Sequence, residues 1–284
     1  MTTYAVTGAS GHLGRLVIEQ LLDQGVAPAD VVALARSPKK AADLAERGVQ
    51  VREADYDRPE TLAPALDGVS KLLLVSGSEP GKRLPQHANV IDAAKTAGVS
   101  RVAYTSLLRA DSSPLALAAE HQGTESLLAA SGLAHTVLRN GWYIENYTPQ
   151  IPTYVATGTV LHAAGDGQIA AATRADYAAA AVAALVEDVD GNVVYELGGT
   201  PFTYAQLAEA VTEATGTTVS ASAVSVPELV GALTSAGLDE GTAGFFAGVD
   251  ANIAEGALDT DSTDLARLIG RAPTPLVDAV RAAA

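Results

Sequence analysis

The sequence predicts an α/β protein built on a doubly wound parallel sheet, the Rossmann fold, with a smaller, mostly helical C-terminal lobe. Apolar strand-like segments alternate with helical segments as far as residue 139, a pattern typical of parallel sheets. A glycine-rich turn joins the first strand to the first helix. We therefore expect residues 1–139 to form an NADP-binding core and residues 140–284 a substrate-side lobe, from which about residues 175–200 return to the sheet.

The first strand, at residues 4–7, leads into a turn with Gly8, Gly11 and Gly14 at three-residue spacing. A helix with one apolar face follows from Leu13, and Gly25 ends it. In a dinucleotide site the three glycines permit a tight turn, a close approach of the pyrophosphate and close helix packing. The helix N-terminus then faces the phosphates. An ordinary strand–helix turn can share this spacing, but the strand, the helix and the N-terminal position together favour the dinucleotide site.

The second strand, at residues 31–35, ends at Arg36. An acidic residue at this place would bind the ribose of NAD, whereas an arginine accommodates the 2′-phosphate of NADP. Ser37 and Pro38 are expected to cap and begin a helix with Lys39 and Lys40 in its first turn. This basic cluster predicts a bound phosphate, and the alternative is a solvated basic turn.

The remaining elements follow the same alternation. Further strands are expected at residues 49–52, 71–75, 101–104, 135–139 and 193–197, and helices at 59–66, 83–97, 115–131 and 175–186. Short strands are expected near Val160 and Ile169, and capping boxes begin two later helices at Thr203 and Ser225. Candidate ligand residues stand at the carboxyl ends of the strands, where open α/β sheets bind ligands.

Composition limits the partners of the chain. It has no Cys and a net charge of −15, which argue against cysteine chemistry and against nucleic acid or anionic membrane as partners. No apolar run reaches the roughly 18 residues of a membrane span, and no signal peptide is visible. We expect a cytoplasmic protein without metal or flavin, because the histidines lack ligand spacing, and the oligomeric state stays open, a homodimer included.

Residues 140–147, Asn-Gly-Trp-Tyr-Ile-Glu-Asn-Tyr, are aromatic and polar in a chain with only 5% aromatic residues. Together with the segments at residues 7–14, 54–56, 104–108 and 172–177, this stretch resembles the NmrA-like family of atypical short-chain dehydrogenases/reductases. Within that family the chain is most similar to the type 2 NAD(P)H:quinone oxidoreductases. The resemblance implies a Rossmann domain, NADPH without flavin, and a quinone as hydride acceptor.

The resemblance also implies site residues. The expected cofactor contacts are Gly8, Ala9, Ser10, Gly11, His12 and Leu13 at the pyrophosphate, Arg36 at the 2′-phosphate, Asp55 and Tyr56 near adenine, Ser76, Gly77 and Ser78 after the fourth strand, Thr105 after the fifth, and Asn140, Gly141, Trp142 and Tyr143 beside the nicotinamide. Asp55 can equally be a plain loop carboxylate. Trp142 and Tyr143 are expected to form a flat apolar wall, or else to pack the second lobe.

The usual acid catalyst of short-chain reductases is missing. Those enzymes use a Tyr with a Lys four residues later, whereas the last lysine here is Lys95, before the fifth strand. His121 stands where NmrA-like relatives often carry Lys, with Glu125 one turn on. We expect His121 to contact the nicotinamide ribose and Glu125 to orient its ring, and the alternative is an exposed helix pair. The expected catalytic residues are His121, Asn140, Trp142 and Tyr143.

A quinone acceptor fits this absence. Hydride addition to a quinone gives a delocalised hydroquinone anion that water can protonate, whereas a simple ketone gives a basic alkoxide that needs a positioned acid. The missing pair therefore argues against an alcohol dehydrogenase and permits quinone reduction by positioning alone. It also fits a rival hypothesis, a non-catalytic NADP(H) sensor that binds a regulatory protein partner.

Overall fold

The computed structural model describes residues 2–284 and contains a seven-stranded parallel sheet in the order β3-β2-β1-β4-β5-β6-β8. Six of its strands lie in the first half of the chain, namely β1 (Tyr4–Val6), β2 (Val31–Ala35), β3 (Gln50–Glu53), β4 (Lys71–Leu74), β5 (Arg101–Leu107) and β6 (Ala134–Asn140). The seventh, β8 (Val193–Leu197), pairs with β6. The doubly wound fold predicted from the alternation is confirmed.

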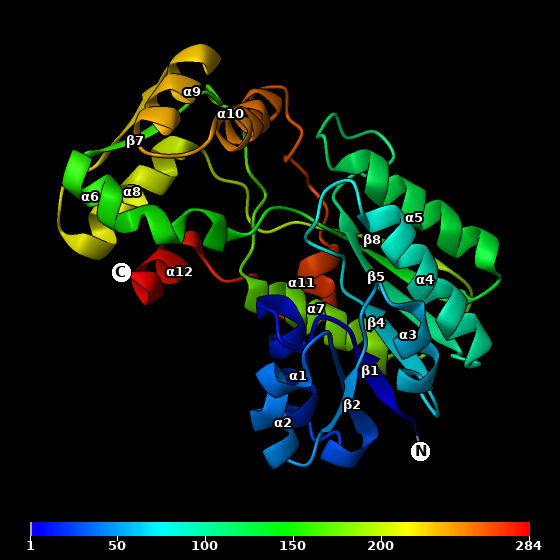
Figure 1. The fold of residues 1–284 in the computed structure, drawn as a ribbon. Coiled ribbons are helices and arrows are strands. Elements are labelled where there is room, and N and C mark those ends of the chain that lie inside the picture. Colours follow the sequence, from blue (N-terminus) through cyan, green and yellow to red (C-terminus); the bar gives the residue numbers. More distant parts are fainter. Residues whose placement is uncertain (1) are drawn as a thin grey trace.

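Helices cover both faces of this sheet (Figure 1). One face carries α3 (Pro59–Ala65), α4 (Arg83–Thr96) and α5 (Ala118–Ser131); the other carries α1 (His12–Asp23), α7 (Arg174–Val186) and α11 (Asp264–Ile269). The short α2 (Ala42–Glu46) packs beside β3. Strand residues alternate between the two faces, so that Val6 and Ala33 join the α1 side and Ala5 and Val32 the α4 side. Burial on both faces explains the continuous apolar strands.

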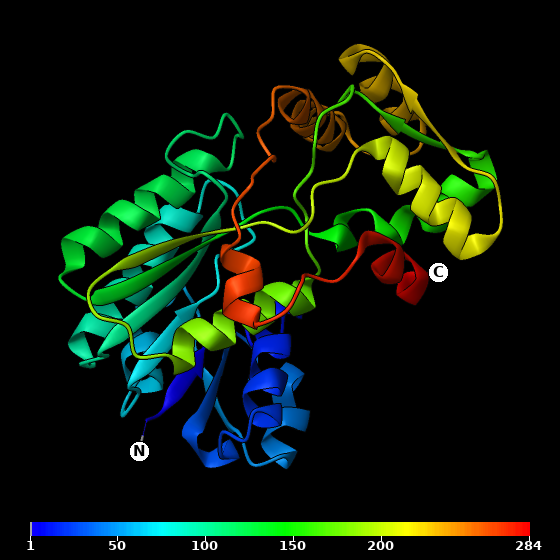
Figure 2. The ribbon, with the colours of Figure 1, turned by 180° about the vertical axis from the view of Figure 1, so that it is seen from behind.

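The C-terminal lobe lies beyond the carboxyl ends of the strands (Figure 2). Its helices are α6 (Ile151–Thr157), α8 (Tyr204–Thr215), α9 (Val226–Ser235), α10 (Glu240–Ala254) and α12 (Leu276–Ala283). A second, two-stranded parallel sheet joins β7 (Thr159–His162) to β9 (Ser220–Ala223). Both predicted capping boxes are present, at Thr203 and Ser225. Among the described residues no helix has the length and apolarity that crossing a bilayer would need.

Most differences from the sequence predictions lie at element ends. β5 continues through Leu107, so that Thr105 and Ser106 belong to the strand, and α5 begins at Ala118 rather than Leu115. Near Ile169 the structure has an isolated bridge to Phe202 instead of a strand. Ser37 makes no capping hydrogen bond, and Lys39 and Lys40 lie in a 3₁₀ turn before α2. Propensity cannot separate a 3₁₀ turn from a first α-helical turn, because the choice depends on the backbone bonds that close it.

The C-terminal segment is linked to α7 by hydrogen bonds to Asp176, a fully buried residue in the first turn of that helix. Its carboxylate accepts hydrogen bonds from the Thr173 hydroxyl at 2.9 Å, the Arg271 guanidinium at 2.6 Å and the Thr274 amide at 2.9 Å. Burial alone would raise the pKa of Asp176, but these bonds outweigh it and hold the pKa below its ordinary value. The link fixes the path of the chain between α11 and α12.

The approach of α1 to β1 depends on Gly14. A Cβ atom on Gly14 would lie 2.5 Å from the Gly8 carbonyl oxygen and 2.9 Å from that of Thr7. We expect Gly14→Ala to destabilise the protein by about 1–3 kcal/mol, because only backbone displacement could relieve the overlap. Urea unfolding of the purified variants measures this.

Gly231→Ala in α9 is the matched control, because a Cβ there meets nothing within 4 Å. It should stabilise the protein by about 0.5–1 kcal/mol through helix propensity. Equal effects of the two substitutions would contradict the close-contact role of Gly14.

Candidate active site

The glycine turn has the geometry that a phosphate needs. Gly8 adopts a φ of +61°, and the Gly11 amide donates to the Gly8 carbonyl at 2.8 Å, which closes the turn. Gly11 is also the N-cap of α1, and it has no side chain that could cap the helix. The first amides of α1 therefore have no intrahelical acceptor and stand at the positive end of the helix dipole. The buried Ala9 fixes the turn to the next strand, since its amide donates to the Leu34 carbonyl at 3.1 Å.

A cavity of about 380 Å³ opens over this turn. Most of the predicted cofactor residues line it, namely Gly8, Ser10, Gly11, His12, Leu13, Arg36, Asp55, Tyr56, Ser76, Gly77 and Ser78. Ala9, Thr105, His121 and residues 140–143 do not line it. The structure thus brings together the phosphate and adenine sides of the predicted site from the ends of four strands, β1, β2, β3 and β4.

At the adenine side, Arg36 is mostly exposed and its guanidinium lies 3.5 Å from the Glu79 carboxylate. An arginine held this loosely can turn toward a phosphate. Asp55 accepts a hydrogen bond from the Asp57 amide at 3.1 Å, which forms a local turn. This contact agrees with the alternative of a loop carboxylate and still leaves Asp55 on the cavity wall.

Tyr56 is anchored more firmly than the sequence suggested. Its hydroxyl donates to the Val75 carbonyl at 2.8 Å and lies 2.5 Å from the Thr7 hydroxyl, which itself accepts from the Val75 amide. Tyr56 thus joins the ends of β1 and β4 beneath the cavity. Burial raises the pKa of Tyr56, so the phenol stays protonated as a donor. Its ring still lines the cavity.

The loop after β4 is held by side chains that the sequence analysis did not select. The Gly77 amide donates to His87 Nε2 at 2.9 Å, and the Gly77 carbonyl accepts from Arg83 Nε at 2.5 Å. The Ser76 amide donates to the Thr105 hydroxyl at 2.8 Å. Thr105 therefore positions Ser76 from outside the cavity. The i, i+4 spacing of Arg83 and His87 on α4 was the available signal, but nothing in the sequence pairs them with Gly77.

His87 has a fixed tautomer. Because Nε2 accepts from Gly77, the proton sits on Nδ1, which lies 2.9 Å from the Thr124 hydroxyl. That hydroxyl donates in turn to the Glu120 carbonyl, so it can accept from His87. Burial and the nearby Arg83 charge lower the pKa of His87 to about 4. The ring is neutral at physiological pH and works as an acceptor for the loop.

His121 and Glu125 do not form the predicted pair. The His121 ring is buried, which excludes the exposed-helix alternative, and its Nδ1 lies 2.7 Å from the Tyr104 hydroxyl. Glu125 instead accepts from the Ser106 hydroxyl at 2.5 Å and from two nitrogens of Arg139. The prediction that Glu125 orients the histidine was wrong, because Arg139 on the neighbouring strand offers it a two-point charged partner.

Arg139 is a further residue that the sequence analysis missed. Its side chain is 10% exposed and contacts three carboxylates, Glu125 at 2.7 Å, Glu196 at 2.8 Å and Asp111 at 2.9 Å. These bonds raise the pKa of Arg139 above its usual value, so it remains charged. The cluster joins α5, β6, β8 and the loop after β5 beside Asn140. Its partners are far apart in the chain, which hides the cluster from sequence patterns.

Asn140 ends β6 with a buried side chain whose Oδ1 has no hydrogen-bond partner. Its carbonyl accepts from the Leu108 amide at 2.8 Å, and the next amide, of Gly141, donates to Leu197 at 2.7 Å. A Cβ on Gly141 would lie 2.8 Å from the Ala170 carbonyl oxygen. The backbone is therefore fixed while one polar atom is left free, an arrangement that suits a ligand amide or hydroxyl.

Trp142 and Tyr143 do not form a shared wall. Trp142 packs against the apolar cluster of the C-terminal lobe, whereas Tyr143 packs against the cluster between the sheet and α7. The Tyr143 ring meets the Tyr177 ring edge-on at 5.4 Å and lies under the Arg174 guanidinium. The alternative of packing the second lobe thus describes Trp142, whereas Tyr143 packs against the sheet side.

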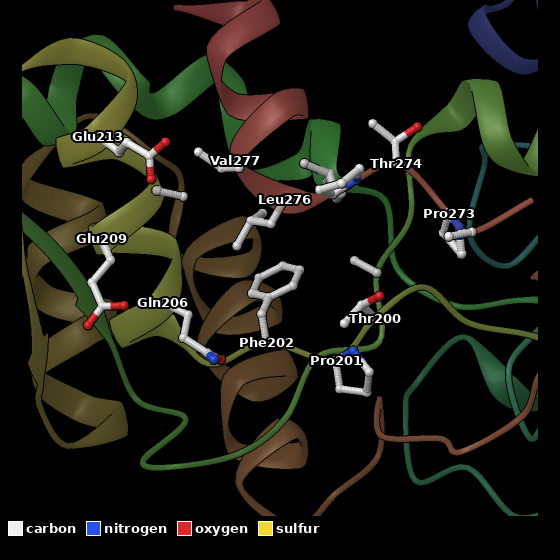
Figure 3. A pocket seen from close by; sticks show the side chains of 15 residues that line it. Thr200, Pro201, Phe202, Gln206, Glu209, Glu213, Pro273, Thr274, Leu276 and Val277 are labelled. Atoms are coloured by element: carbon white, nitrogen blue, oxygen red, sulfur yellow. The ribbon is translucent and has the colours of Figure 1, made fainter.

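A second cavity, of about 420 Å³, lies between α8 and the segment before α12 (Figure 3). Phe202, Leu276 and Val277 line it, with Glu209 and Glu213 at one side. Although it is slightly larger, none of the predicted site residues lines it. The glycine-turn cavity is therefore the better candidate for the cofactor.

These features fit a dinucleotide. Gly11 and the first residues of α1 line the cavity, and that helix end has no side-chain cap. Outside the cavity, Asn140 Oδ1 lacks a hydrogen-bond partner. Gly8, Ser10, Gly11 and His12 would hold the pyrophosphate. Fold and site together define a dinucleotide-binding Rossmann protein.

The chain belongs to the NAD(P)H-binding family, whose model matches residues 8–188. It is similar to quinone oxidoreductase 2 of Escherichia coli (strain K12), with 49% identity over 277 residues that cover 97% of this chain and 96% of that protein. An NmrA-like family domain-containing oxidoreductase of Aspergillus flavus is 33% identical over 291 residues, or 98% and 94% of the two chains. The predicted resemblance is confirmed.

Two solved structures show the same fold. The crystal structure of the NADPH-dependent quinone oxidoreductase of Escherichia coli complexed with NADPH matches with a TM-score of 0.94 and 49% identity, covering 98% of each chain. The Citrobacter sp. triphenylmethane reductase complexed with NADP(H) matches with a TM-score of 0.95 and 37% identity, covering 99% of this chain and 100% of that one.

The two buried histidines make stability depend on pH. Burial and the Arg83 charge lower the pKa of His121 to about 3, with His87 adding to the effect, and the pKa of His87 is about 4. An unfolded histidine has a pKa near 6.5. Between pH 6.5 and 5 the unfolded chain therefore binds protons that the folded chain does not. As the pH is lowered through this range, the free energy of unfolding should decrease by up to about 1.4 kcal/mol per pH unit for each ring.

Urea unfolding at pH 7, 6 and 5 measures this loss. His87→Gln and His121→Gln should each remove about one proton from the pH slope, and the double variant about two. A wild-type stability that does not change between pH 7 and 5, or variants with the wild-type slope, would contradict the assignment.

Proposed function

We propose that this protein transfers a hydride from NADPH to a quinone, without flavin or metal. The observation that carries the proposal is the 49% identity, over nearly the whole chain, to a quinone oxidoreductase of known NADPH-bound structure. The NADPH-side features of this chain support it, since the glycine turn, Arg36 and the loop after β4 line one cavity.

The cofactor side of the site combines backbone groups with a few side chains. The turn at residues 8–13 receives the pyrophosphate, and Arg36 leaves Glu79 to receive the 2′-phosphate. Asp55 and Tyr56 border the adenine side, and Ser76, Gly77 and Ser78 close the cavity with small side chains. His87, Arg83 and Thr105 hold that last loop in place, so little reorganisation is needed when the cofactor binds.

The reacting side combines His121, Asn140, Gly141, Trp142 and Tyr143. Bound NADPH supplies the hydride at its nicotinamide ring. Asn140 offers its free Oδ1 to the cofactor amide, and Trp142 gives the acceptor an apolar surface. Tyr143 supports this loop through its contacts with Tyr177 and Arg174.

None of these groups is a strong acid at physiological pH. The low pKa of His121 keeps its ring neutral, and burial raises the pKa of Tyr143. A reaction that needs a general acid with a pKa near physiological pH is therefore disfavoured, whereas a quinone needs only correct positioning and water. This supports a quinone over a simple ketone as the acceptor.

Further parts of the proposal follow from charge and composition. The net charge of −15 favours small-molecule partners over nucleic acid, and we place the protein in the cytoplasm. Residues 1–139 would carry the cofactor site and residues 140–284 the substrate side, with residues 175–200 completing the sheet as α7 and β8. A homodimer is compatible with these features.

Arg36 should give a preference for NADPH over NADH. A charge-assisted contact between the guanidinium and the 2′-phosphate is worth on the order of 1.5–3 kcal/mol, so Arg36→Ala should weaken NADPH binding roughly tenfold to a hundredfold. NADH binding should change little. Calorimetric dissociation constants for both cofactors measure this.

Arg58→Ala is the control, because Arg58 is also exposed and paired with carboxylates but does not line the cavity. Equal wild-type affinity for the two cofactors would refute the role of Arg36.

The protein should oxidise NADPH with small benzoquinones and naphthoquinones, followed by the loss of NADPH absorbance against the uncatalysed background. Trp142→Ala should mainly raise the KM for the quinone and leave the NADPH dissociation constant nearly unchanged, since the indole contacts the acceptor. Tyr4→Ala, at the amino end of β1, controls for loss of aromatic packing away from the site.

Tight NADPH binding with no turnover of any quinone would reject the enzyme. That outcome would favour the sensor hypothesis, in which the protein binds NADP(H) without catalysis and binds a regulatory protein partner.

A further inference from the structure

The inference concerns the buried pair of Tyr104 on β5 and His121 on α5, and it rests on the proposed function for the place of the cofactor. The Tyr104 side chain is fully buried and that of His121 nearly so. The tyrosine hydroxyl and His121 Nδ1 lie 2.7 Å apart. His121 Nε2 makes no hydrogen bond within residues 2–284, so one ring nitrogen is held and the other is free.

The direction of this hydrogen bond follows from which protons have partners. The Tyr104 hydroxyl lies 2.7 Å from His121 Nδ1, and the Thr124 hydroxyl is the other hydrogen-bonding group beside it. If Nδ1 carried the proton, the phenol proton would have to turn to the Thr124 hydroxyl, which already accepts from His87 Nδ1 and donates to the Glu120 carbonyl. If the phenol donates, its proton is satisfied and the neutral ring carries its own proton on Nε2. Burial raises the pKa of Tyr104, which keeps that donor protonated.

The pair lies next to the cofactor cavity. Tyr104 precedes Thr105, whose hydroxyl accepts from the amide of the cavity residue Ser76. The neighbouring His87 ring meets the Tyr104 ring edge-on at 5.4 Å and holds Gly77. His87 and His121 thus have opposite tautomers. One offers a lone pair to the protein loop, and the other offers an N–H group.

We propose that Tyr104 is a positioning residue that fixes His121 in the neutral Nε2–H tautomer, so that the ring donates a hydrogen bond to a ribose hydroxyl of NADPH. Where NmrA-like relatives often carry a charged lysine, this chain then has an uncharged hydrogen-bond donor, the His121 ring. It binds the cofactor and transfers no proton. The site consequently holds the cofactor ribose without placing a positive charge beside the nicotinamide ring.

The first test needs no activity. Ring ¹⁵N spectra of histidine-labelled, cofactor-free protein at pH 7 should show His121 with a protonated Nε2 and a hydrogen-bonded, unprotonated Nδ1. Tyr104→Phe should move the Nδ1 resonance toward that of a free imine nitrogen, while the His87 resonances keep their Nδ1–H pattern. A protonated Nδ1 or an imidazolium ring in the wild type would overturn the proposal.

The second test measures NADPH affinity by calorimetry. His121→Leu, which lacks a donor, should weaken binding roughly twofold to tenfold, the range for one neutral hydrogen bond. His121→Gln, which keeps an N–H donor at similar reach, should recover most of that loss. Tyr104→Phe should fall between wild type and His121→Leu. Unchanged affinity in all three variants, or equal losses in His121→Gln and His121→Leu, would overturn the role of the ring as a donor.

The two proposals fail in different ways. If the spectra and affinities follow the expected pattern but no quinone is reduced, the reaction is wrong and the Tyr104–His121 inference stands. If quinones are reduced and the affinities do not change, the inference is wrong and the reaction stands. Should His121→Leu not fold, the wild-type spectrum and the Tyr104→Phe variant still decide the matter.

Discussion

The structure depends on the close contact between the turn after β1 and the start of α1. The positive φ of Gly8 reverses the chain, and the lack of a Cβ on Gly14 lets the helix lie against the backbone of Thr7 and Gly8. This contact sets both the direction of α1 over the sheet and the position of its free amides. Cofactor binding and packing therefore share one constraint, since a helix moved outward would lose the phosphate site along with its core contacts.

Around that turn, buried hydrogen bonds determine whether each polar group donates or accepts. Tyr56 joins β1 to β4, His87 and Arg83 hold Gly77, and Thr105 holds Ser76. Low polarity makes an unpaired group costly, so the direction of each bond is determined by its neighbours. The same rule leaves His121 neutral. A site assembled from neutral donors and backbone suits hydride transfer to an acceptor that stabilises its own charge.

The junction with the C-terminal lobe has a different basis. Arg139 forms ion pairs with three carboxylates beside Asn140. Asp176 accepts hydrogen bonds from an arginine and a backbone amide of the C-terminal segment. Charged groups that are this buried need several partners. Each cluster therefore fixes several chain segments at once, and the cofactor side and the lobe meet at a defined place.

The sequence by itself determined the sheet, the glycine turn and most of the cavity lining, because these follow from local periodicity and from the carboxyl ends of successive parallel strands. Only the tertiary structure decided what the polar side chains do. Glu125 pairs with Arg139 rather than with His121, His87 accepts a hydrogen bond from the Gly77 amide, and Trp142 and Tyr143 pack against different apolar clusters. Such contacts join residues distant in the chain, and they are chosen by which buried donor finds which acceptor, a property that no local pattern carries.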